Sequence, residues 1–111
     1  MPVPIYQAKA ELFKTLGHPL RIRVLELLCE RPMPVRDLLA EIDVEAPNLS
    51  QQLAVLRRSG LVIARRSGNT VVYELAGADV SEMMRAARRI LTELLADQRE
   101  LLIELNAEPT Q

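Results

Sequence analysis

Apolar side chains recur at helical spacing through the first 42 residues of the chain. They fall into three groups, Ile5, Ala8, Leu12 and Leu16, then Leu20, Val24, Leu27 and Leu28, then Val35, Leu38, Leu39 and Ile42. Steps of three and four residues place each group on one face of a helix. Gly17-His18-Pro19 ends the first predicted helix, and Pro19 suits the first turn of the second. Residues 31–34 include two prolines and predict a break before the third.

A fourth helix is predicted after the short polar connection at residues 43–45. We expect it to start near Pro47, with Leu49, Leu53 and Leu56 on its buried face. The opposite face then carries polar side chains, because the leucines occupy only one side of the helix.

A β-hairpin is predicted beyond this helix, which ends at Ser59-Gly60. Residues 61–66 and 70–75 are rich in β-branched side chains and predict two strands. They are joined across Ser67-Gly68-Asn69, where Gly and Asn both tolerate the positive φ of a tight hairpin.

The longest apolar stripe lies near the C-terminus. Asp79 and Glu82 resemble a capping pair, and we predict a helix from about Val80 to Leu105. Its stripe alternates steps of four and three residues through Val80, Met84, Ala87, Leu91, Leu94, Gln98, Leu101 and Leu105, and it is widened by Met83, Ile90, Leu95 and Leu102. So broad a face exceeds what one small domain can cover, and a symmetric homodimer is the simplest source of a partner helix. The alternative is that the stripe packs on the chain's own first helix.

These elements predict one fold. The 111 residues form a single domain, mainly α with a small β-hairpin, in the order α-α-α-α-β-β-α. This is a winged helix-turn-helix, with the helix-turn-helix at 34–59 and the wing hairpin at 61–75. The helices at 1–17 and 79–105 are expected to form a dimer interface.

The distribution of charge along the chain indicates a negatively charged partner, although the net charge of −1 does not. Residues 46–73 contain four arginines and no Asp or Glu, whereas residues 74–111 contain four basic and eight acidic side chains. Such segregation indicates a cationic surface, and a helix followed by an arginine-bearing hairpin is what a winged helix uses to bind double-stranded DNA.

Other features of the composition indicate the compartment. The single cysteine, Cys29, excludes an internal disulfide and fits a reducing cytoplasm. The first residues lack the basic region and apolar run of a secretion signal. No stretch approaches the roughly 18 apolar residues of a membrane span. We therefore predict a cytoplasmic protein without a membrane partner.

Candidate DNA contacts follow from setting the leucines of the fourth helix inward. Pro47, Gln51, Ala54, Val55 and Arg58 then point outward, with Asn48, Ser50 and Gln52 on the flanks. Gln and Asn pair with adenine, Ser bonds bases or phosphates, and Arg suits guanine or phosphate. The predicted DNA-binding residues are Pro47, Asn48, Ser50, Gln51, Gln52, Arg57, Arg58, Arg65, Arg66, Asn69 and Thr70. The alternative is a merely solvated helix face, which the adjacent arginine hairpin makes less attractive.

Three segments resemble the ArsR/SmtB family of winged-helix regulators. Residues 12–25 are similar to the opening of that family, residues 48–62 to its recognition helix and following strand, and residues 65–73 to its wing. The resemblance implies a dimeric, repressor-like protein that binds imperfect palindromic operators. Ser50 matches a serine of the family motif, whereas Gln52 stands where His is common, a difference that would alter base preference.

The resemblance also implies which residues make the dimer. In the family the first and last helices usually form the interface. Carried onto this chain, the interface residues are Leu12, Val80, Met84, Ala87, Leu91, Leu94, Leu101 and Leu105.

Metal sensing, which many family members perform, does not carry over. Pro34 and Arg36 stand where the family's thiolate site has its cysteines, and the last helix has no histidine. Asp97, Glu100 and Glu104 share a face but are expected to be solvated or paired with arginines. We therefore predict no cofactor, although an effector metal remains compatible with the family.

Two single residues were considered as sensors. His18 is expected to help turn the chain, with a nickel or cobalt site as the alternative. Cys29 is expected to be a buried, inert thiol, with a redox switch as the alternative.

Catalysis is not predicted, because one His, one Cys and no glycine-rich phosphate loop do not supply a catalytic set. Two other functions stay open. The winged helix could serve as a protein–protein interaction module that docks through its acidic last helix. A DNA-binding regulator could also leave sensing to a partner protein.

Overall fold

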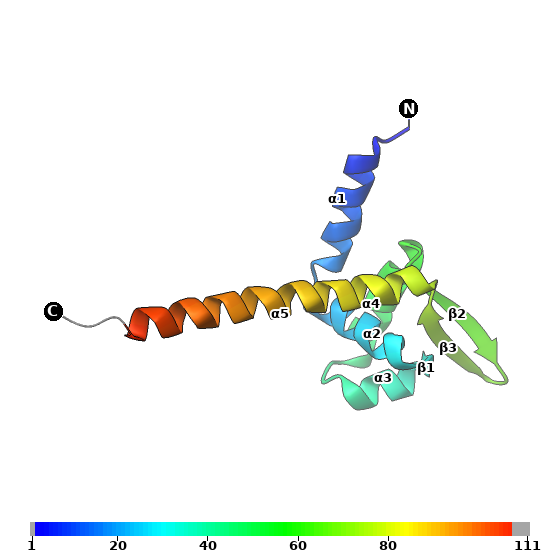
Figure 1. Ribbon diagram of the computed structural model, residues 1–111. Coiled ribbons are helices and arrows are strands. Elements are labelled where there is room, and N and C mark those ends of the chain that lie inside the picture. Colours follow the sequence, from blue (N-terminus) through cyan, green and yellow to red (C-terminus); the bar gives the residue numbers. More distant parts are fainter. Residues whose placement is uncertain (1, 108–111) are drawn as a thin grey trace. The chain divides into compact units, whose positions relative to one another are not determined.

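The computed structural model describes residues 2–107 and divides into two compact units, one up to Ser81 and one from Glu82 onward (Figure 1). The elements are α1 (Ile5–Leu16), α2 (Pro19–Glu30), β1 (Met33–Pro34), α3 (Val35–Glu41), α4 (Ala46–Arg58), β2 (Val62–Ser67), β3 (Thr70–Leu75) and α5 (Ala78–Ala107). The predicted order of helices and hairpin is confirmed, and the fold is a winged helix-turn-helix.

The end of α4 shows how the sequence determines a helix boundary. Gly60 has a φ of +79°, which a residue without Cβ adopts at no steric cost. Its N–H donates to the carbonyl of Arg57 at 3.0 Å, and the N–H of Leu61 donates to Leu56 at 3.1 Å. These two bonds form a Schellman motif and satisfy carbonyls that the helix leaves without partners. The predicted stop at Ser59-Gly60 therefore has a clear physical basis.

A three-stranded antiparallel sheet carries the hairpin, with β3 between β1 and β2. Ser67 pairs with Thr70, so Gly68 and Asn69 form a two-residue turn. Gly68 has a φ of +65°, whereas Asn69 keeps a negative φ. This pattern fits a type II′ turn, in which only the first central residue needs a positive φ. Asn69 therefore does not use the tolerance of a positive φ that the sequence analysis considered for it.

The strand β1 was not predicted, because residues 31–34 indicated only a break. Met33 pairs with Tyr73 and Pro34 pairs with Val72 of β3. A proline is compatible with this position because β1 lies at the edge of the sheet, where a missing N–H costs no ladder bond. The pairing anchors the start of α3 against the hairpin.

The core of the first unit is aliphatic and is centred on α4. Leu49, Leu53 and Leu56 are at most 1% exposed, as predicted from their spacing. Each buried leucine contributes about 1.5–3 kcal/mol relative to an exposed one. Val80, predicted for the dimer interface, is only 9% exposed within the single chain and belongs to this core.

The helix α5 runs for 30 residues, slightly beyond the predicted span at both ends. Glu82, predicted to pair with Asp79 as a cap, instead accepts hydrogen bonds from Arg85 at 2.9 Å and Arg89 at 3.3 Å. The Arg85 guanidinium, followed by that of Arg89, holds the pKa of Glu82 below its ordinary value. Because these side chains are solvent-exposed, the pairs add little to stability.

Leu38→Ala tests the core. This side chain of α3 is 0% exposed, and its truncation is expected to lower the free energy of unfolding by about 2–5 kcal/mol. The measurement is urea unfolding at fixed protein concentration. The half-buried neighbour Leu39 provides the matched control, since Leu39→Ala should cost clearly less. Equal losses for the two variants would contradict the assigned core.

Candidate nucleic-acid interface

The exposed face of α4 matches the prediction in part. Pro47, Asn48, Ser50, Gln51, Arg57 and Arg58 are all exposed. Ala54 and Val55, which were predicted to point outward, are half-buried. The polar surface is therefore concentrated in the first half of the helix, and its last turn carries the two arginines.

Gln52 is the main departure from the predicted site. It is only 7% exposed and lies inside the unit, so it does not flank the exposed face. Its Oε1 accepts a hydrogen bond from Nε of Arg21 at 2.8 Å, and its Nε2 donates to Oδ1 of Asn48 at 3.0 Å. The helical wheel missed this because Gln52 has a buried polar partner on α2, which sequence spacing on α4 does not reveal.

The hairpin arginines do not act as one pair. Successive side chains of a strand point to opposite faces of a sheet, so Arg65 and Arg66 leave β2 in opposite directions. Arg65 forms an ion pair with Glu74 of β3 at 3.2 Å. Glu74 lies one residue beyond residues 46–73, the segment without Asp or Glu. A count of charges within that segment therefore treats Arg65 as unpaired.

The other three arginines of residues 46–73 have no carboxylate partner among the described residues. Within residues 2–107, neither Arg57, Arg58 nor Arg66 takes part in an ion pair. Of the four arginines in residues 46–73, only Arg65 has a carboxylate partner within the described residues, so this segment keeps an excess of positive charge that suits a phosphate backbone.

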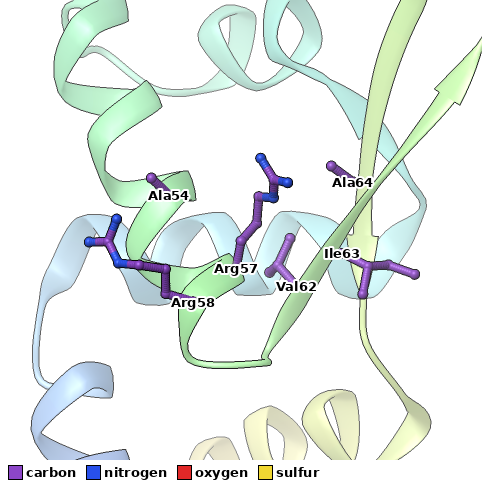
Figure 2. Close-up of a pocket in the computed structure, with 6 residues that line it drawn as sticks. All are labelled: Ala54, Arg57, Arg58, Val62, Ile63 and Ala64. Carbon is purple, nitrogen blue, oxygen red and sulfur yellow. The ribbon is translucent and has the colours of Figure 1, made fainter.

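A surface concavity of 570 Å³ lies between the end of α4 and the start of β2 (Figure 2). It is lined by Ala54, Arg57, Arg58, Val62, Ile63 and Ala64. Figure 2 shows Arg57 extending between α4 and the strand, whereas Arg58 leaves on the other side of the helix. The hollow is open, and of its two arginines Arg57 is the one that lies toward the hairpin.

The interface gains a residue that sequence reasoning did not select. Arg36 of α3, which also forms an ion pair with Asp37 at 3.8 Å, lies beside Asn69 and Thr70 of the hairpin turn, because all three line one shallow surface depression. The pairing of β1 with β3 produces this arrangement. A prediction of that short edge strand would have been the only sequence signal for it.

The two sensor candidates lie at the start of α2 and on α2 itself. His18 precedes α2 in an extended conformation, and its Nδ1 is buried without a hydrogen-bond partner among the described residues. Cys29, which was expected to be buried, is only half-buried on α2. Residues 2–107 contain no group of three or more His, Cys, Asp or Glu side chains arranged to hold a metal ion. No helix in that range is long and apolar enough to cross a bilayer.

Comparison with known proteins identifies the family. The family model described as bacterial regulatory protein, arsR family, matches residues 18–64. Rv0081 of Mycobacterium tuberculosis, an uncharacterized HTH-type transcriptional regulator, is 50% identical over 105 residues, which cover 94% of this chain and 92% of that protein. The chain belongs to the arsR family. It is therefore a DNA-binding transcriptional regulator, from a family of regulators and not of enzymes.

A further relative and two solved structures are also similar to this chain. The biofilm growth-associated repressor of Agrobacterium fabrum is 36% identical over 90 residues, or 78% of this chain and 77% of that protein. The crystal structure of Rv0081 matches with a TM-score of 0.81 at 51% identity, covering 87% of this chain and 98% of that one. Mb0332 of Mycobacterium bovis, a homodimeric winged helix-turn-helix DNA-binding domain, matches with a TM-score of 0.76 at 27% identity, covering 82% and 84% of the two chains.

Arg66→Ala tests the wing as a phosphate contact. Because Arg66 carries an unpaired charge, its loss is expected to weaken binding to operator and random DNA alike. The slope of log affinity against log salt should fall by about 0.9 for one lost phosphate contact. Fluorescence anisotropy across a salt series measures both.

Glu74→Gln is the matched variant, for which the opposite change in DNA affinity is expected. It removes the partner of Arg65 and should therefore raise affinity for any duplex and steepen the salt slope. If both variants leave the slope unchanged, the hairpin does not contact phosphates.

Proposed function

We propose that this arsR-family protein is a homodimeric, sequence-specific regulator that binds palindromic operators and represses transcription. The observation that carries the proposal is the exposed polar first half of α4 beside an arginine-bearing hairpin. Side chains on such a helix can reach base edges, while arginines on the helix end and hairpin neutralise phosphates. The repressor name of the Agrobacterium relative supports the direction of regulation.

Exposed apolar side chains support the dimer. Ile5, Tyr6 and Phe13 of α1 are 63–73% exposed, and the leucines of α5 from Leu91 to Leu105 are 51–62% exposed. Large apolar side chains exposed in such numbers along a helix mark an interaction site on a small protein. The homodimeric state of the Mb0332 domain supports a second copy as its occupant. Val80 is left out of the proposed interface, while Leu12, Met84, Ala87, Leu91, Leu94, Leu101 and Leu105 are retained.

A two-fold dimer provides the geometry for operator recognition. It would place two copies of α4 in successive major grooves, about 34–36 Å apart, with the hairpins at the flanks. The operator should then be a palindrome with half-sites about one helical turn apart. Occupation of such a site in a promoter would block transcription.

We propose that the signal that releases DNA does not bind at the known metal sites of the family. The thiolate positions hold Pro34 and Arg36, and the described residues contain no metal-binding cluster. These features favour a partner protein or a ligand of another class over a thiolate-bound metal. The cytoplasmic location is part of the same proposal.

Binding to the DNA upstream of the protein's own gene is the first test of this function. Fluorescence anisotropy against that DNA and a scrambled control should show selective, salt-sensitive binding by the wild type. Gln51 is exposed on α4, and Gln51→Ala should reduce discrimination by about 1–3 kcal/mol if it makes a paired base contact. An equal loss on operator and scrambled DNA would remove the base-reading role of Gln51. An absence of selectivity, here and in a random-sequence selection, would favour protein docking instead.

Leu94→Glu combined with Leu101→Glu tests the dimer. Light scattering should give twice the 12.5 kDa chain mass for the wild type and the single chain mass for the variant, because buried carboxylates oppose apolar association. Glu100→Lys changes charge on the opposite side of the helix and should leave the dimer intact. A wild type that stays at 12.5 kDa at micromolar concentration would contradict the proposal.

A further inference from the structure

A chain of three hydrogen bonds crosses the interior of the first unit and ends on the exposed face of α4. Nη1 of Arg21 donates to the carbonyl of Thr15 in the last turn of α1 at 3.1 Å. Its Nε donates to Oε1 of Gln52 at 2.8 Å, and Nε2 of Gln52 donates to Oδ1 of Asn48 at 3.0 Å. Three helices thereby contribute to the position of one surface side chain.

The direction of this chain is determined by chemistry. A guanidinium only donates hydrogen bonds, so the atom of Gln52 that faces Arg21 must be the amide oxygen. The amide nitrogen of Gln52 must then face Asn48, and a nitrogen that donates requires an oxygen opposite. Both amide groups are therefore oriented by Arg21, although amide oxygen and nitrogen are otherwise interchangeable in shape.

We propose that this relay makes Asn48 a hydrogen-bond donor toward DNA, with Gln52 and Arg21 as positioning residues; this rests on the proposed sequence-specific function. With Oδ1 held by Gln52, the Nδ2 group is the part of Asn48 left to face outward. Asn48 is exposed in the first turn of α4, and N-terminal residues of a recognition helix are those that contact base edges.

The expected base preference follows from the donor. In the major groove guanine presents N7 and O6, thymine O4 and adenine N7 as acceptors, whereas cytosine presents only the N4 donor. Each operator half-site should therefore have one position, read by Asn48, at which cytosine is rejected. A freely rotating Asn would lack this bias, because it could turn either its oxygen or its nitrogen toward the base.

The burial of Gln52 explains why the orientation is held firmly. At 7% exposure its amide cannot exchange these partners for bulk water. Breaking either hydrogen bond would leave a buried polar group unsatisfied, which costs more than an exposed bond is worth. The relay is thus rigid at its centre and presents one donor at its surface end.

Two substitutions should each place an oxygen where the NH2 group of Asn48 faces outward, in different ways. Asn48→Asp keeps an oxygen for Gln52 and replaces the outward NH2 by a second oxygen. Gln52→Glu keeps the acceptor for Arg21 but removes the donor to Asn48, so the Asn48 amide should turn its oxygen outward. Gln52→His is the matched control, because a neutral imidazole can accept from Arg21 on one nitrogen and donate to Asn48 from the other.

The experiment is selection of binding sites from a random duplex pool with the full chain, for the wild type and the three variants. The wild type should reject cytosine at one half-site position. Asn48→Asp and Gln52→Glu should both reverse this preference, by about tenfold toward cytosine or adenine, at that position alone. Gln52→His should retain the wild-type motif, because residue 52 is buried and, contrary to the expectation from the sequence, is not placed to read a base itself. Thermal melting of each variant is measured in parallel, since a purely structural role would lower affinity for every sequence equally.

The outcomes separate the inference from the function on which it rests. If the wild type selects no motif, the sequence-specific function fails. If it selects a motif that Asn48→Asp leaves unchanged or weakens uniformly, the relay proposal alone is overturned, because Asn48 then contacts phosphate or nothing. Asn48→Asp alters an exposed side chain, so this result stands even if Gln52→Glu fails to fold.

Discussion

The central constraint on this protein is that α4 must serve the core and the proposed DNA-facing surface at once. Leu49, Leu53 and Leu56 are buried to 1% exposure or less, and together they fix the rotation of the helix about its axis. Because three buried leucines determine that rotation, the polar first half of the helix has one possible face to the solvent. The hairpin that follows then starts from a defined point, since Gly60 ends the helix in a Schellman motif.

Most of the fold could be predicted from the sequence because its determinants are local. Three- and four-residue spacing indicated the helices, and glycines marked both the end of α4 and the hairpin turn. The strand β1 was missed for the same reason. Its two residues, Met33 and Pro34, carry no periodic pattern, and their strand exists only because β3 provides a partner about 40 positions further along.

The exposed residues of the site could be predicted from the sequence, but the contacts between its side chains could not. Exposure of Gln51 and Arg58 follows from the helical wheel. The burial of Gln52 does not, because its partner Arg21 lies on another helix, 31 positions earlier in the sequence. The pairing of Arg65 with Glu74 was likewise hidden from a count of charges, since a β-hairpin brings together residues that a linear block separates. Polar partners across elements are thus the part of a site that sequence patterns leave undetermined.

Under the proposed function, one of these two contacts would act on affinity for DNA and the other on specificity. Glu74 pairs with one hairpin cation, which would limit the sequence-independent attraction to phosphate without involving α4, the helix proposed to read bases. The buried Arg21–Gln52 pair acts on the other quantity, because it orients an amide at the surface and adds no charge there. A protein-docking module would need neither a moderated cationic wing nor an amide of fixed polarity on its exposed helix. The combination is better explained by a surface that must discriminate one duplex sequence among many, where excess non-specific affinity lowers the specificity ratio.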